Sequence, residues 1–242
     1  MDDTRNEVPV VYEFCGSPGA GKTYLAKQLV TRKLCNAHMV SLDGENRYRR
    51  FLKKILAIVQ HPGILTGHLL TNIQIVRLHD PRAKDFFRLV YNMSFVSSML
   101  VKHRLGRAIV LDQGLIQAEW SNYYHGRTSP NRLLLARRFE RLIEQLGVQS
   151  LAVIDVQVPG HVARERIGSR VSGGSPLDGG GDESWVRAEN ALVHMAEFVR
   201  SLEACCPTVH RVVMINSGNG ISDGVLDRIV GSRVGDSGNR KQ

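Results

Sequence analysis

The stretch FCGSPGAGKTYL, residues 14–25, decides the fold because it contains the pattern G-x-x-x-x-G-K-[ST] without a gap. An apolar, β-branched run at residues 8–14 leads into it, and an apolar pattern typical of a helix follows. A glycine-rich turn in this position lets backbone N–H groups converge on phosphate oxygens. We therefore expect a phosphate-binding loop made of Gly16, Ser17, Pro18, Gly19, Ala20, Gly21, Lys22 and Thr23.

The last two residues of this loop indicate its ligand. In such a loop the lysine, here Lys22, reaches the β and γ phosphates of a nucleoside triphosphate, and the hydroxyl of Thr23 binds magnesium. The helix that begins at Lys22 adds the positive end of its dipole. ATP and Mg²⁺ are the cofactors that this arrangement predicts.

Strand and helix patterns alternate along the rest of the chain. Strands are expected at 38–42, 108–112, 151–158 and 209–215, and helices at 48–59, 64–105 (broken near Asp80 and Pro81), 133–146, 160–171, 185–202 and 221–234. Alternation of this kind predicts an α/β fold of the P-loop NTPase type: a five-stranded parallel sheet with helices on both faces. We expect a single domain over residues 1–235 and a disordered tail at 236–242.

Composition limits the partners. No apolar run reaches the roughly 18 residues that would span a bilayer, and the chain starts with polar residues, so we expect a cytoplasmic protein with no membrane partner. The net charge of +9 permits contact with nucleic acid. Because the arginines are scattered along the chain, a small polyanionic substrate explains this charge equally well.

Three features favour phosphoryl transfer to an acceptor over a motor or a switch. The chain has no second domain for hydrolysis to move, and it has no N-K-x-D element for guanine recognition. The third feature is a helix pattern that carries Arg164, Arg166 and Arg170 into a glycine-rich loop at 172–184. The alternative is a nucleotide-dependent regulator or a nucleic-acid-stimulated ATPase.

In its order of elements the chain resembles the small P-loop kinases, the nucleoside and nucleotide kinases with their thymidylate-kinase-like members. The resemblance implies a kinase that moves the γ-phosphoryl group of ATP to a nucleotide, a nucleoside or another small hydroxylated acceptor. The segment ERIGSR resembles the E-R-x-x-x-R lid helix of that family. It implies a mobile lid at about 160–184 in which Arg166 and Arg170 clamp phosphates; exposed arginines on a solvated helix are the alternative.

Two aspartates are candidates for catalysis. Asp112 ends the strand AIVLD, where a magnesium-binding carboxylate is expected, and thymidylate-kinase-like proteins have an Asp-Arg pair there; this chain has Gln113 in place of the arginine. Asp43 lies in LDGEN, which resembles the L-D-G-D-N of adenylylsulfate kinases and, more loosely, an element of chloramphenicol phosphotransferases. That resemblance implies that Asp43 faces the acceptor hydroxyl. The alternative for Asp43 is the N-cap of the helix that follows it. Either Asp43 or Asp112 can be the catalytic base.

The acceptor is expected in a helical region at about 45–105. Gln117, Trp120 and Tyr123 follow Asp112 and are candidates for a further wall of the acceptor site at the carboxyl edge of the sheet. Aromatic residues in that position are as often part of the core.

Overall fold

The computed structural model describes residues 10–34, 37–40, 62–79, 83–103, 108–127, 129, 131–169, 177, 180–216 and 223–231. Its strands are β1 (Val10–Cys15), β2 (His38–Val40), β3 (Ile109–Leu111), β4 (Ser150–Gln157) and β5 (Val209–Ile215). Its helices are α1 (Lys22–Arg32), α3 (Pro62–Arg77), α4 (Ala83–His103), α5 (Leu115–Tyr124), α6 (Arg132–Gln145), α7 (Gly160–Gly168), α8 (Asp182–Cys205) and α9 (Asp223–Gly231).

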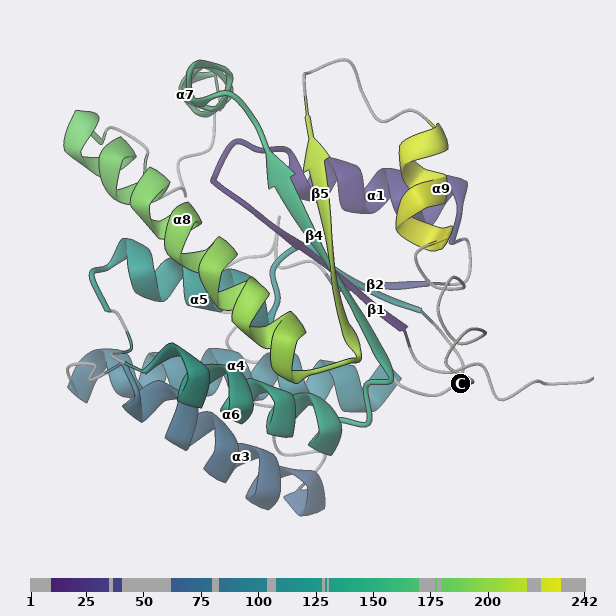
Figure 1. Ribbon diagram of the computed structural model, residues 1–242, viewed down its shortest axis with the longest axis vertical. Helices are drawn as coiled ribbons and strands as arrows, with labels where there is room; N and C mark the ends of the chain where they lie inside the picture. Colours follow the sequence, from purple (N-terminus) through teal and green to yellow (C-terminus); the bar gives the residue numbers. More distant parts are fainter. Residues whose placement is uncertain are drawn as a thin grey trace, which may run out of the picture.

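The described strands form one parallel sheet of five strands in the order β2-β3-β1-β4-β5. Strand β1 is central, and all six of its residues are buried, which suits a parallel strand covered on both faces. Figure 1 shows α1 and α9 on one side of the sheet and α3, α4, α5, α6 and α8 on the other. This arrangement confirms the α/β fold with helices on both faces of a five-stranded parallel sheet.

Alternation along β1 divides the core into two layers. Tyr12 and Phe14 pack with Leu25 and Leu29 of α1 and with Leu226 of α9. Val11 and Cys15 belong to the larger cluster on the opposite face, which is built mainly from α4, α5, α6 and α8. Because side chains alternate along a strand, Glu13 points into this second layer although it carries a carboxyl group.

Some expected boundaries differ from the observed ones. Residues 182–184 form the first turn of α8, so the glycine-rich loop ends before them; Asp182 and Glu183 suit the positive end of that helix. Residues 115–124, for which no helix was predicted, form α5. Asp43, Arg170 and nearly all of 170–179 lie outside the described residues, as do residues 45–61 of the expected acceptor region. Among the described residues, no helix combines the length and apolar character needed to cross a membrane.

Candidate functional site

The loop between β1 and α1 is shaped by glycines in the left-handed region. Gly16 has φ 140° and Gly19 has φ 82°. A Cβ at Gly16 would collide with the backbone carbonyl oxygen of Val156 on β4, and one at Gly19 would lie 2.7 Å from the carbonyl oxygen of Ala163 on α7. Only glycine satisfies both the torsion and the space. The loop can therefore lie directly against β4 and α7.

Lys22 and Thr23, the first two residues of α1, lie at the end of this loop. The Lys22 ammonium donates to the carbonyl oxygens of Gly16 and Ser17, at 3.0 and 2.9 Å, so its side chain folds back over the loop. The Thr23 hydroxyl donates to Oδ2 of Asp112 at 3.0 Å, and Asp112 is fully buried just after β3. Thr23 and Asp112, which sequence analysis linked to magnesium, thus contact each other next to Lys22 in the chain.

The oxygen donors at this point fit a magnesium ion. A hydroxyl and a carboxylate are the kinds of ligand that Mg²⁺ takes, usually together with waters and substrate phosphates. Thr23 in the first turn of α1 and Asp112 directly after β3 are within hydrogen-bonding distance of each other. They are the residues that would hold the ion, which when bound supplies positive charge beside the phosphates.

Two further side chains contact the loop from the other side. Arg166 on α7 donates to the carbonyl oxygen of Gly19 at 3.3 Å, so this lid candidate lies beside the loop. Asn216, directly after β5, donates to the carbonyl oxygen of Ala20 at 2.8 Å. Sequence analysis did not select Asn216, because nothing local to a strand end marks a contact across 196 residues. Arg164 is occupied elsewhere, in a 2.8 Å ion pair with Asp182.

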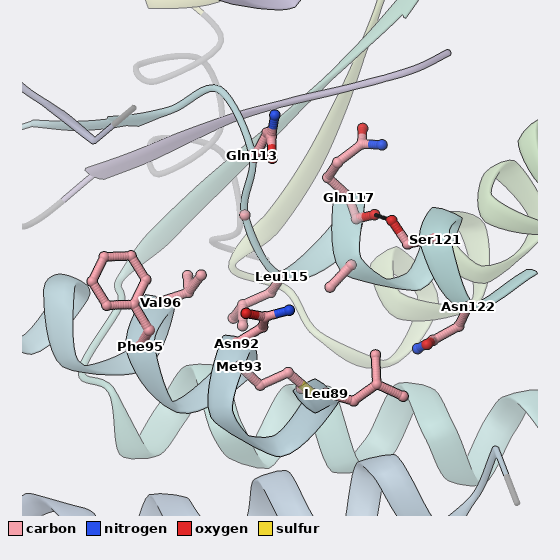
Figure 2. A pocket seen from close by; sticks show the side chains of 12 residues that line it. Leu89, Asn92, Met93, Phe95, Val96, Gln113, Leu115, Gln117, Ser121 and Asn122 are labelled. Atoms are coloured by element: carbon pink, nitrogen blue, oxygen red, sulfur yellow. Dashed lines mark hydrogen bonds between the residues drawn. The ribbon is translucent and has the colours of Figure 1, made fainter. Parts of the chain in front are cut away.

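A cavity of about 260 Å³ opens between α4 and α5 (Figure 2). It lies beside the carboxyl end of β3, because Gln113 and Gly114, which line it, follow that strand and Asp112. One part of its wall is apolar and the other carries amide and hydroxyl groups. The twelve lining residues are Leu89, Asn92, Met93, Phe95, Val96, Gln113, Gly114, Leu115, Gln117, Ala118, Ser121 and Asn122.

The expected acceptor wall is only partly where sequence analysis placed it. Gln117 lines the cavity. Trp120 and Tyr123 are instead 2% and 6% exposed and belong to the apolar core. On α5 the two aromatic residues lie on the side that packs against the rest of the domain, which is the core alternative that their sequence pattern left open.

Glu13 is a buried carboxyl close to this site that sequence analysis missed. Its side chain accepts the backbone N–H of Leu115 at 3.0 Å and that of Gln117 at 2.9 Å. Burial raises the pKa of Glu13 to about 7, while its backbone hydrogen bonds act in the opposite direction. The signal in the sequence was a lone acid within the apolar strand VVYEFC.

No family model matches this chain, and no curated protein does. The fold resembles solved structures of deoxyadenosine kinase from M. mycoides. The form with bound dATP is 16% identical to this chain, with a TM-score of 0.49. The form with the products dCMP and a flexible dCDP is 15% identical, with a TM-score of 0.49. The form with bound dCTP is 13% identical, with a TM-score of 0.45. Each match covers 92% of this chain and 98% of the other.

Proposed function

We propose that this protein is a P-loop kinase that transfers the γ-phosphoryl group of ATP, with Mg²⁺, to a hydroxyl group of a small acceptor, with a nucleoside as the first candidate. The observation that carries the proposal is the position of the cavity. It shares Gln117 with the phosphate-binding loop, because the side chain of that residue accepts the N–H of Gly16 at 3.1 Å. An acceptor in the cavity would lie next to bound phosphates, as transfer requires.

The lining of the cavity favours a neutral acceptor. None of its twelve residues carries a charge at neutral pH, whereas a phosphate-bearing acceptor needs cationic partners. An apolar wall with Phe95 suits a flat ring, and the amides of Asn92 and Gln113 can donate and accept hydrogen bonds with its edge. A nucleoside combines such a ring with hydroxyl groups. A nucleotide or another small hydroxylated molecule is the next candidate.

The loop and its neighbours would supply the charge that the reaction needs. In the proposed step the acceptor hydroxyl oxygen bonds to the γ-phosphorus, the bond from that phosphorus to the β,γ-bridging oxygen breaks, and the hydroxyl proton passes to a carboxylate. In this proposal Lys22 and Arg166 neutralise phosphate oxygens, and their contacts with the loop support that role. We assign the proton to Asp43, with Asp112 as the alternative base. The short distance between Asp112 and Thr23 supports a magnesium-binding role for Asp112.

The test is a transfer assay with γ-labelled ATP and a panel of acceptors: nucleosides, nucleoside monophosphates, other small alcohols, DNA and RNA. We expect label on a nucleoside. Lys22→Ala serves as the inactive control. ATP hydrolysis that rises with DNA or RNA while no acceptor is labelled would favour the regulator or ATPase instead, and would overturn the kinase assignment.

A pair of matched variants tests the cavity itself. Ala118 lines the cavity, and Ala204 is exposed on α8, outside that lining. Ala118→Leu should raise the KM for the acceptor roughly tenfold or more, because it adds side-chain volume where the acceptor must fit. The KM for ATP should stay unchanged. Ala204→Leu adds the same atoms on the surface and should leave both constants unchanged. Equal effects of the two variants would remove the cavity as the acceptor site.

A further inference from the structure

The first turn of α5 is held by a residue from a different strand. Its N-cap is Gly114, which makes no side-chain hydrogen bond, so the helix has no local cap. Glu13 on β1 takes over this role through its bonds to Leu115 and Gln117. A carboxyl group at the N-terminus of a helix satisfies N–H groups that have no partner within the helix and complements the dipole.

Glu13 and Gly114 fit each other closely. A Cβ at position 114 would collide with Cδ of Glu13 and lie 2.5 Å from its Oε2. Glu13 is only 1% exposed, so its side chain has little room to move away. The glycine at 114 therefore lets the carboxyl group approach the backbone of the helix.

Gln117 extends this contact to the phosphate-binding loop. Its backbone N–H is bonded to Glu13, and its side-chain carbonyl oxygen accepts the buried N–H of Gly16, the first residue of the loop. Gly114, Leu115 and Gln117 also line the cavity. The first turn of α5 thus borders the cavity and contacts the loop, and Glu13 on β1 fixes that turn through its two hydrogen bonds.

We propose that Glu13 is a positioning residue that acts through Gln117 to hold the phosphate-binding loop and the wall of the cavity in a fixed relation. The role in catalysis rests on the proposed kinase function. The positioning itself does not, because it concerns contacts of the unliganded protein. Glu13 touches neither the phosphates nor the acceptor in this proposal.

The primary test measures amide hydrogen exchange of the full unliganded chain in Glu13→Gln. Glutamine keeps the size of the side chain but presents an NH₂ group to one of the two backbone N–H donors. We expect exchange at Leu115 and at Gly16 to accelerate roughly tenfold or more, since both contacts lose their support. A purely local role would accelerate exchange at Leu115 and leave Gly16 unchanged, and that result would overturn the proposal.

Two further variants make the test independent of how well Glu13→Gln folds. Gln117→Leu removes the oxygen that binds Gly16 and keeps the backbone bond to Glu13, so exchange should accelerate at Gly16 and not at Leu115. The double variant should match Gln117→Leu at Gly16, because residues in one chain of contacts are not additive. If the accelerations of exchange at Gly16 caused by the two single variants multiply in the double variant, Glu13 does not act through Gln117. If Glu13→Gln does not fold, Glu13→Asp replaces it in the same comparison.

Leu142→Ala is the control for general destabilisation. Leu142 is fully buried on α6 and belongs to the core layer that packs against α8. This variant should lower global stability and leave exchange at Gly16 unchanged while the protein is folded. In kinetics, Glu13→Gln should lower kcat and raise the KM for the acceptor, and Leu142→Ala should do neither. A failed acceptor panel would reject the kinase function and leave the exchange result standing.

Discussion

Raising the pH from 4.5 to 8 should weaken the fold through the buried carboxyl group of Glu13. Its pKa rises from the ordinary value of 4.5 to about 7 because burial disfavours the charged form. Between these values the folded protein binds more protons than the unfolded chain, so stability falls as the pH rises. The stability that protonated Glu13 contributes is fully present below pH 4.5 and is lost as the pH rises to about 7. Each pH unit between 4.5 and 7 lowers the free energy of unfolding by about 1.4 kcal/mol, so the total loss is about 3 kcal/mol.

Urea unfolding at several pH values, followed by circular dichroism, measures this effect. Glu13→Gln cannot titrate at position 13, so the wild-type free energy of unfolding should fall by about 3 kcal/mol relative to the variant between pH 4.5 and 8. The pKa of His79 is also shifted. Burial acts to lower this pKa, but the Glu119 carboxylate, whose Oε2 lies 2.9 Å from Nε2 of His79, raises it overall. It is present in both proteins and cancels in the comparison. A difference between the two proteins that is constant across this range would refute the reasoning.

The remaining predictions concern the proposed reaction. Lys22→Ala should abolish transfer and keep a native circular dichroism spectrum, because the Lys22 side chain folds back over the loop and belongs to neither layer of the apolar core; near-normal transfer would reject the phosphate-loop role. Asp43→Asn should keep the affinity for ATP in calorimetry and lose transfer by roughly two to four orders of magnitude. Asp112→Asn should instead raise the magnesium concentration needed for half-maximal rate, and the reverse pattern would make Asp112 the base. Arg166→Ala should lower kcat more than it weakens ATP binding, and an equal loss in both would argue against a clamp formed during the reaction.

The elements around the phosphate-binding loop could be predicted because their signals are contiguous. Strand, glycines, Lys22 and Thr23 follow one another within a few residues, and each has a local physical meaning. The parallel sheet followed from alternating patterns in the same way. The order β2-β3-β1-β4-β5 could not be predicted, because it depends on which strands pair, and pairing is a contact between distant segments.

The wall of the cavity escaped prediction for a similar reason. Residues 115–124 were not predicted as a helix, although Leu115, Ile116, Trp120 and Tyr123 are buried at helical spacing. Polar residues stand between these buried positions and after them, and they obscured that spacing. Glu13 was read as part of an apolar strand, and its partners lie about a hundred residues further along the chain. Long-range hydrogen bonds of this kind leave no pattern in either segment alone.

The close fit between Glu13 and Gly114 constrains how this protein can vary. Any side chain at position 114 requires the carboxyl group at position 13 to withdraw, and a shorter residue at position 13 leaves the first turn of α5 without its cap. A larger residue at position 114 is therefore expected only together with a shorter one at position 13. Among related sequences, positions 13 and 114 should covary as a pair, although 100 residues separate them in the chain.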